Sequence, residues 1–405
     1  MVKTKSETMS TAVSAIAATI VAMIGLAVAS VTPEVPAQDT ERKQAPQQAP
    51  QQAPQQAPQQ APQQASTSGV GPAQTRSMPK GFPNGGTRCY LNSVLASLMC
   101  VDAFVSLNDT SHSAHADGCS AVANSAVDIA RKARAGADAA LIRNSMTQLL
   151  NAIDLCNVSM SGKRPDPANP ADTFSGRYGT AHPREEDAMF FFHDLLAVAG
   201  NMRAPFSLKT RKSYAPIAEG RASVEPDLAG EHTDGNEGQI FENSLFGPVT
   251  PSRPGQSVQD LLEEGLAWVH REEQDSQSPQ HRFMRENICN AGGALAIAIG
   301  RLVGRTQTHE LELTEVLRVR LTHPSGDPGV ESKETQRYNL VAVCEGHHSP
   351  TNFDTGHYTA RGLVDGTWYR FDDDRVTVMS GAPAASDSAR IVFYVAEETL
   401  RTTST

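Results

Sequence analysis

The stretch Gly81-Phe-Pro-Asn-Gly-Gly-Thr-Arg-Cys-Tyr-Leu-Asn-Ser93 decides how this chain is interpreted. It places Cys89 at the start of a segment whose apolar residues recur at helical spacing. Main-chain N–H groups and the helix dipole at such a position favour the thiolate, the form of cysteine that attacks carbonyl carbons. Glycines before it let the main chain approach a substrate closely. The stretch therefore predicts a nucleophilic cysteine at the amino end of a helix.

A second informative segment begins at Gly356-His357-Tyr358, with its histidine 268 residues after Cys89. Phe371-Asp372-Asp373 follows it, and between the two lies Asp365-Gly366, a strong turn signal for a β-hairpin. Residues opposite each other on antiparallel strands point to the same face, so this hairpin can set a carboxylate against His357.

Two registers of the hairpin remain open from the residues alone. A four-residue loop over 363–366 sets His357 opposite Asp372, whereas a two-residue turn at Asp365-Gly366 sets it opposite Asp374. In either register, Asp373 is expected to point to the other face of the sheet.

Cysteine, histidine and a carboxylate together form a nucleophilic triad. The carboxylate fixes the imidazole tautomer and stabilises the imidazolium that forms when the thiol loses its proton. Acyl transfer also needs hydrogen-bond donors for the developing oxyanion, and Asn84 and the main-chain N–H of Cys89 are the candidates. We interpret the chain as a cysteine hydrolase.

Composition excludes several other classes of protein. The net charge of −10 argues against nucleic acid as a partner. Six cysteines are too few and too scattered for a disulfide framework, and none form the close pairs of a structural zinc site. Apart from Cys89, we expect them to be small core or surface residues. His347 and His348 lack metal-ligand spacing and are expected in a loop, so no metal or cofactor is predicted.

The first 32 residues predict contact with a membrane. Residues 11–31 form an uncharged, mostly apolar segment that is long enough to span a bilayer. Ala27-Val28-Ala29 also matches the small-residue pattern of a signal-peptide cleavage site. A retained span that anchors the protein and a cleaved export signal both remain open.

Residues 33–78 are expected to be a disordered linker. The tetrad Ala-Pro-Gln-Gln occurs five times between 45 and 64, and proline at every fourth position blocks helix and sheet alike. A catalytic domain is expected over 79–399 and a short tail over 400–405. Within the domain, helical periodicity comes first and strand patterns follow, which predicts an α+β fold with a cleft between a helical lobe and a sheet lobe. Residues 207–255 are expected to be turn-rich with short strand-like pieces around 239–246, and a capping box at Ser257 is expected to open a helix that runs through Val269.

The two motifs resemble those of the ubiquitin-specific proteases, a papain-like family of deubiquitinating cysteine peptidases. The cysteine motif of that family is matched by Gly81, Asn84, Gly86, Cys89, Tyr90, Asn92 and Ser93, and its histidine motif by Gly356, His357, Tyr358, Trp368, Phe371, Asp372 and Asp373. Weaker matches to the family also occur between the two motifs, so the resemblance covers residues 81–397. Thr87 and Arg88 depart from the pattern, as does Phe190, but none of them is a triad member.

The resemblance implies a papain-like fold with a helical thumb, a β-sheet palm and reduced, zinc-free fingers. It implies Cys89 as nucleophile, His357 as general base and Asp372 as the orienting acid, which selects the four-residue loop. Asn84 would be the oxyanion donor and Asp373 an auxiliary carboxylate near the oxyanion water network.

The implied activity is hydrolysis after the C-terminal glycine of ubiquitin through a thioester, with ubiquitin and ubiquitinated proteins as partners. A protease for another ubiquitin-like modifier and a catalytically silent ubiquitin-binding module are the alternatives. The expected location is a membrane-anchored or exported protein whose catalytic domain acts in the cytosol, including that of a host cell.

Overall fold

The structure, a computed structural model, describes residues 77–107, 119–159, 172–181, 186–216, 232–233, 241–267, 269–273, 280–300, 309–324, 331–349 and 352–397. All of them lie in the compact unit that begins at Ser77. The apolar segment 11–31, the Ala-Pro-Gln-Gln repeat and the tail over 400–405 lie outside the described residues. Among the described residues, no helix combines the length and apolar character that a bilayer crossing requires.

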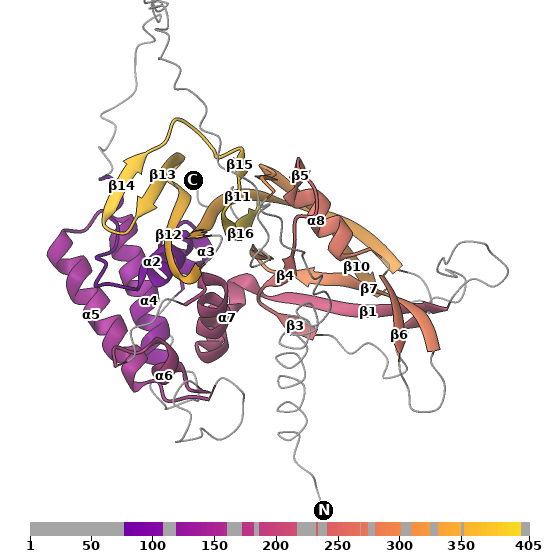
Figure 1. Cartoon of the computed structure of the whole chain (residues 1–405), viewed down its shortest axis with the longest axis horizontal. Helices are drawn as coiled ribbons and strands as arrows, with labels where there is room; N and C mark the ends of the chain where they lie inside the picture. The colour runs from indigo at the N-terminus through magenta and orange to yellow at the C-terminus, as the bar shows by residue number, and fades with distance from the viewer. Residues whose placement is uncertain are drawn as a thin grey trace, which may run out of the picture. The chain divides into compact units, whose positions relative to one another are not determined.

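The helices gather on one side of this unit (Figure 1). Side chains cap the amino ends of three of them: Asp138 before α5, Thr173 before α6 and Asp187 before α7. Their bounds are α2 Cys89–Leu98, α3 Asp102–Val105, α4 Cys119–Arg134, α5 Ala139–Leu155, α6 Phe174–Tyr178, α7 Ala188–Val198, the 3-10 helix η2 Gly200–Phe206 and, apart from this group, α8 Val258–Gly265.

The strands form one large mixed sheet and a small second one. Beginning at one edge, the main path of the large sheet runs β14-β13-β12-β11-β10-β7-β1-β2, and β16 joins β11 to β8. The bounds are β1 Leu208–Pro216, β2 His232–Thr233, β3 Phe241–Asn243, β4 Phe246–Val249, β5 Gln256–Ser257, β6 Val269–Glu273, β7 Gln280–Ala291, β8 Ala294–Ile299, β9 Leu311–Glu312, β10 Val316–Pro324, β11 Glu331–Ser349, β12 Asn352–Val364, β13 Thr367–Asp372, β14 Arg375–Val378, β15 Ala385–Ser386 and β16 Ala389–Ala396.

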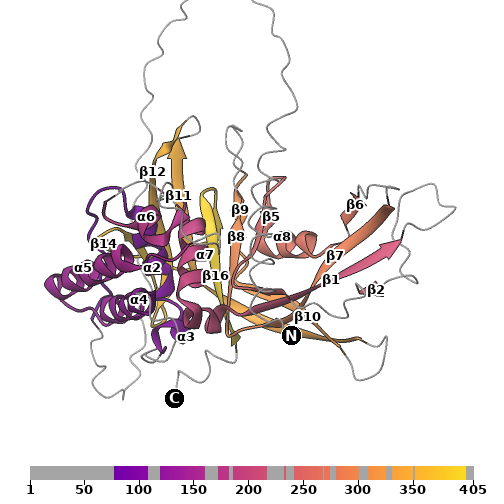
Figure 2. The same ribbon diagram turned by 90° about the horizontal axis from the view of Figure 1, so that it is seen from below.

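The sheet has a core on each face because β16 alternates apolar residues to both sides. Ile391, Phe393 and Val395 belong to the core shared with the helices, whereas Val392 and Tyr394 belong to a second core with α8 and β10. The helices α2–α7 thus cover the β11, β12 and β16 end, and β1, β7 and β10 extend away from them (Figure 2). This is the α+β arrangement of a helical lobe against a sheet lobe that the sequence predicts.

Aromatic side chains fix α2 against its neighbouring helices. The ring of Tyr90 lies 5.5 Å from that of Phe191 in α7, and Phe191 lies 5.0 Å from Tyr178 in α6. These edge-to-face contacts bury Tyr90, the residue that follows Cys89, and pack the start of α2 against α6 and α7.

Two local expectations from the sequence are wrong. Residues 207–255 read as turn-rich, yet they contain β1, a nine-residue strand that pairs with β7 far along the chain. The helix that begins after Ser257 has the expected capping box but ends at Gly265, and Val269 starts β6 instead of ending that helix. In both places pairing with β7, distant in the chain for β1 and local for β6, overrides the pattern of the sequence.

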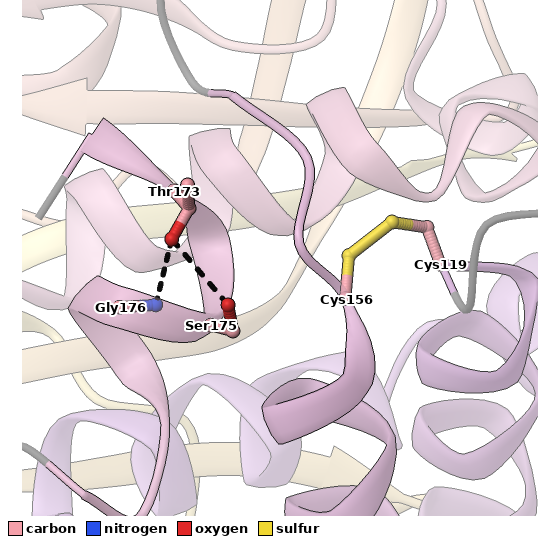
Figure 3. The surroundings of a disulfide bond; sticks show 5 residues. All are labelled: Cys119, Cys156, Thr173, Ser175 and Gly176. Carbon is pink, nitrogen blue, oxygen red and sulfur yellow. Dashed lines mark hydrogen bonds between the residues drawn. A yellow bond between two sulfur atoms is a disulfide. The ribbon is translucent and has the colours of Figure 1, made fainter. Parts of the chain in front are cut away.

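A disulfide corrects the expectation that Cys119 and Cys156 are unpaired (Figure 3). The helices α4 and α5 form an antiparallel hairpin, so the first residue of α4 meets the residue after α5, with 5.0 Å between their Cα atoms. The main-chain oxygen of Cys156 also accepts a hydrogen bond from the N–H of Ser175 in α6. Sequence spacing alone could not reveal this pairing, because it depends on the helix hairpin.

Replacing both cysteines, Cys119→Ala with Cys156→Ala, is expected to destabilise the domain. A cross-link over 37 residues restricts the unfolded chain, which is worth about 3–4 kcal/mol. Thermal unfolding without reductant should show a Tm lowered by roughly 10 °C. Cys289→Ala, which removes a buried thiol that is in no disulfide, is the control and should shift Tm far less. An unchanged Tm in the double variant would contradict a stabilising disulfide.

Candidate active site

Cys89 is the first residue of α2, as the sequence predicts. The side chain of Arg88 does not cap this helix, and no acidic residue stands in its first turn. The positive end of the helix dipole therefore acts on the sulfur and favours the thiolate. Only 3% of Cys89 is exposed.

The loop before Cys89 depends on glycine at two positions. Gly86 has φ +126°, a conformation that residues with a side chain rarely adopt. Its N–H donates to Oδ1 of Asn84 at 3.0 Å, which orients the amide of Asn84. At Gly81, a Cβ would lie 2.1 Å from the main-chain oxygen of Asp373, so only glycine permits this close approach.

His357 and Asp372 are in direct contact. Nε2 of His357 lies 2.6 Å from Oδ1 of Asp372, and both side chains are partly exposed. This hydrogen bond engages Nε2, so Nδ1 is the ring nitrogen left to interact with a different group. A carboxylate held against one nitrogen of an imidazole sets which tautomer the ring adopts.

The hairpin reaches this contact through the two-residue turn, so the four-residue loop selected by the resemblance is wrong. Val364 pairs with Thr367 across Asp365-Gly366. Both turn residues have positive φ, as a tight hairpin turn requires. The ladder ends at Ala360 and Phe371, and Asp372 already pairs with Arg375.

Asp372 therefore meets His357 as a diagonal neighbour on the same face and not as its direct partner, within the reach of such pairs. The prediction that His357 and Asp372 lie on the same face of the hairpin is confirmed, whereas the predicted loop length is wrong. Asp374, the alternative partner, is exposed.

Asp373 joins the cysteine segment to the histidine hairpin. Its carboxylate accepts from Nδ2 of Asn84 and from Nδ2 of Asn92, each at 2.8 Å. Its main-chain oxygen accepts from the N–H of Phe82 at 2.9 Å. Asn92 stands one turn after Cys89 in α2 and is 3% exposed. Its i+3 spacing from the cysteine was the available signal for a residue on the same helix face.

Asp373 also lies nearer to His357 than strand alternation predicts. Its φ of +54° takes it out of the strand, and ligand atoms of His357, Asp372 and Asp373 lie within 4.8 Å of one another. Among the described residues this is the group that could hold a metal ion, but its oxygens already accept the hydrogen bonds given above. His347, expected in a loop, lies in β11 opposite His357 and contacts Oγ1 of Thr359.

Two other buried thiols of the domain are poor nucleophiles. Burial raises the pKa of Cys100 and of Cys344 to about 12, so both remain protonated at neutral pH. Cys344 contacts Oγ of Ser93 at 3.2 Å inside the core. The position at a helix start therefore distinguishes Cys89 from its neighbours.

Comparisons with known proteins identify the family of this chain. The family model for ubiquitin carboxyl-terminal hydrolase matches residues 80–394. Human ubiquitin carboxyl-terminal hydrolase 31 is 44% identical over 59 residues, which are 14% of this chain and 4% of that protein. Mouse ubiquitin carboxyl-terminal hydrolase 3 is 35% identical over 69 residues, 17% of this chain and 13% of that protein. The matches thus span a small part of these curated relatives.

Solved structures share the fold at low sequence identity. The SAGA Ubp8/Sgf11/Sus1/Sgf73 DUB module bound to ubiquitin aldehyde gives a TM-score of 0.55 at 13% identity, covering 80% of this chain and 70% of that one. The same module bound to monoubiquitin gives 0.53 at 14% identity, with 82% and 72% covered. With a family model that spans most of the described unit, the chain belongs to the ubiquitin carboxyl-terminal hydrolase family.

Proposed function

We propose that this protein is a deubiquitinating cysteine protease that hydrolyses the bond after the C-terminal glycine of ubiquitin. The observation that supports this most is the 2.6 Å contact between His357 and Asp372, made in a domain whose Cys89 begins a helix. A histidine oriented by a carboxylate and a cysteine favoured as thiolate are the parts that thiol-dependent acyl transfer requires.

In the proposed reaction, the Cys89 sulfur attacks the carbonyl carbon of the terminal glycine. Nδ1 of His357 takes the thiol proton while Asp372 stabilises the resulting imidazolium. The imidazolium then protonates the leaving lysine amine, and a thioester remains on Cys89. A water molecule, deprotonated by the same ring, hydrolyses the thioester and releases the carboxylate.

Asn84 is the proposed side-chain donor to the oxyanion, together with the N–H of Cys89. One hydrogen of its amide nitrogen is given to Asp373 in the structure, which leaves the second hydrogen for the substrate. Asp373 thereby positions the amide, and this is the role we assign to that auxiliary carboxylate.

The burial of Cys89 supports a substrate with a thin, extended end. A cysteine that is 3% exposed is accessible to a chain that ends in residues without side chains. A glycine terminus fits this requirement, because each added Cβ would widen the chain next to the buried sulfur.

A ubiquitin probe with an electrophilic carboxyl terminus is expected to form a covalent adduct with the full-length protein. Cys89→Ala should abolish the adduct, seen as a mass shift by intact-protein mass spectrometry. Cys100→Ala is the matched control and should react as the wild type does, because burial holds its thiol protonated.

An adduct with another ubiquitin-like modifier and none with ubiquitin would transfer the assignment to that modifier. Tight ubiquitin binding without any adduct would instead indicate a silent binding module.

Asp372→Ala is expected to lower kcat by roughly 10²–10⁴-fold, because the imidazole loses the group that sets its tautomer. Asp374→Ala, the alternative partner two residues away, should change kcat less than about twofold, as exposed positions outside the site usually do. Steady-state cleavage of a fluorogenic ubiquitin amide measures both. Equal losses in the two variants would rule out Asp372 as the orienting acid.

We also propose that residues 11–31 bring the protein to or across a membrane before it meets ubiquitin in a cytosol. The Cys119–Cys156 disulfide supports passage through an oxidising compartment, since such bonds are rare in proteins made and kept in the cytosol. Mass spectrometry of the amino terminus should find either cleavage near Ala29 or an intact end in the membrane fraction. An intact end in the soluble fraction would contradict both.

A further inference from the structure

Arg390 occupies an unusual position at the start of β16. The pairing with β11 shifts between Ile391 and Ala389, so Arg390 sits at a bulge beside Glu345 and Cys344. Only 7% of the residue is exposed, although arginine is almost never so buried without partners.

The guanidinium of Arg390 lacks the hydrogen bonds that such burial requires. Its Nε is buried and has no hydrogen-bond partner. Its Nη1 lies 3.9 Å from Oδ2 of Asp187, which is an ion pair but longer than a hydrogen bond. A buried charge with unfilled donors is costly, and a fold retains it where something else compensates.

A second, partly buried arginine of the same sheet has more hydrogen-bond partners than Arg390. Nη2 of Arg361 donates to Oε1 of Glu345 at 2.6 Å and to the main-chain oxygen of Ala385 at 3.0 Å. Ser386 donates to the same Glu345 oxygen at 2.6 Å. Arg361 thus joins β11, β12 and the segment before β16 through two acceptors on Nη2, although its Nε, like that of Arg390, is buried without a hydrogen-bond partner. Arg390 has no comparable set of partners.

The surroundings of Arg390 adjoin the catalytic histidine. Asp187 caps α7, and its side chain remains 25% exposed. The hydroxyl of Tyr358, the residue after His357, is hydrogen-bonded to the main chain of Ala188 at the same helix start. The charges of Asp187 and Arg390 act in opposite directions on the pKa of Tyr358, which burial raises far above its ordinary value. Arg390 thus lies where the helical lobe meets the sheet lobe, next to the site.

We propose that Arg390 is a substrate-binding residue, whose guanidinium donates hydrogen bonds to main-chain carbonyl oxygens of the extended peptide segment that leads to the scissile bond. This inference rests on the proposed function and specifies how its substrate is held.

Neutral carbonyl oxygens fit this position better than an acidic side chain does. Asp187 already offsets the positive charge of Arg390 at 3.9 Å, so the pair presents unfilled donors without a net charge. An extended peptide offers carbonyl oxygens along its length, and the planar guanidinium carries five N–H donors to meet them. The bound peptide would supply the acceptors that the fold itself leaves out.

The test compares Arg390→Met, Arg390→Lys and the control Arg361→Met in the full-length protein. Cleavage of a fluorogenic ubiquitin amide gives KM and kcat, and thermal unfolding gives Tm. Arg390→Met should raise KM about tenfold, as expected for loss of charge-assisted hydrogen bonds, with kcat within about threefold. Its Tm should stay the same or rise, because an apolar side chain replaces an incompletely paired buried charge. Arg390→Lys should give an intermediate KM.

Arg361→Met should show the opposite pattern, with Tm lowered by roughly 10 °C and KM within about twofold, because Glu345 loses its buried partner. An Arg390→Met protein that is destabilised or unfolded, with the KM of any folded fraction unchanged, would make Arg390 a structural partner of Asp187 and overturn the proposal. A wild-type protein that does not cleave the ubiquitin amide at all would overturn the proposed function, and the role of Arg390 with it.

Discussion

The three hydrogen bonds of Asp373 hold together two segments that are far apart in the chain. Its carboxylate accepts from Asn84 and Asn92, and its main-chain oxygen accepts from Phe82. Gly81 allows the two backbones to come this close, since any Cβ there would collide with that oxygen. Because these bonds join the cysteine loop to the end of β13, the position of Cys89 relative to His357 depends on them.

The rest of the domain holds each side of this junction in place. The aromatic contacts of Tyr90 and Phe191 press α2 against α7, and the sheet positions the hairpin that carries His357. At its far end, the hairpin turn is bound to α4, where Nη2 of Arg134 lies 3.0 Å from Oδ1 of Asp365. Strand β13, which carries Asp372 and pairs with the histidine strand β12, is therefore tied to the helical lobe at both ends.

The sequence was most informative where chemistry requires a fixed order of residues. Cys89 at a helix start and His357 with Asp372 in a hairpin follow from local patterns, and the structure places them so. The predicted loop length was wrong because the family motif was taken to imply that Asp372 lies directly opposite His357. A diagonal contact requires only that both side chains lie on the same face of the sheet.

The features that the sequence did not reveal depend on long-range packing. The Cys119–Cys156 disulfide requires the hairpin of α4 and α5, and β1 requires its partner β7. The incomplete pairing of Arg390 is visible only when all neighbouring donors and acceptors are known. Polar satisfaction in a core is a property of the whole fold, so no short stretch of sequence contains it.

A double-mutant cycle with Asn92→Ala and Asp373→Ala, measured on kcat/KM for ubiquitin amide cleavage, tests the central role of the Asp373 junction most directly. If the two side chains act as one connection, the double variant should be about as slow as the slower single variant, a coupling of about 1–3 kcal/mol. Losses that simply add would show that Asn92 and Asp373 act independently and would contradict the account.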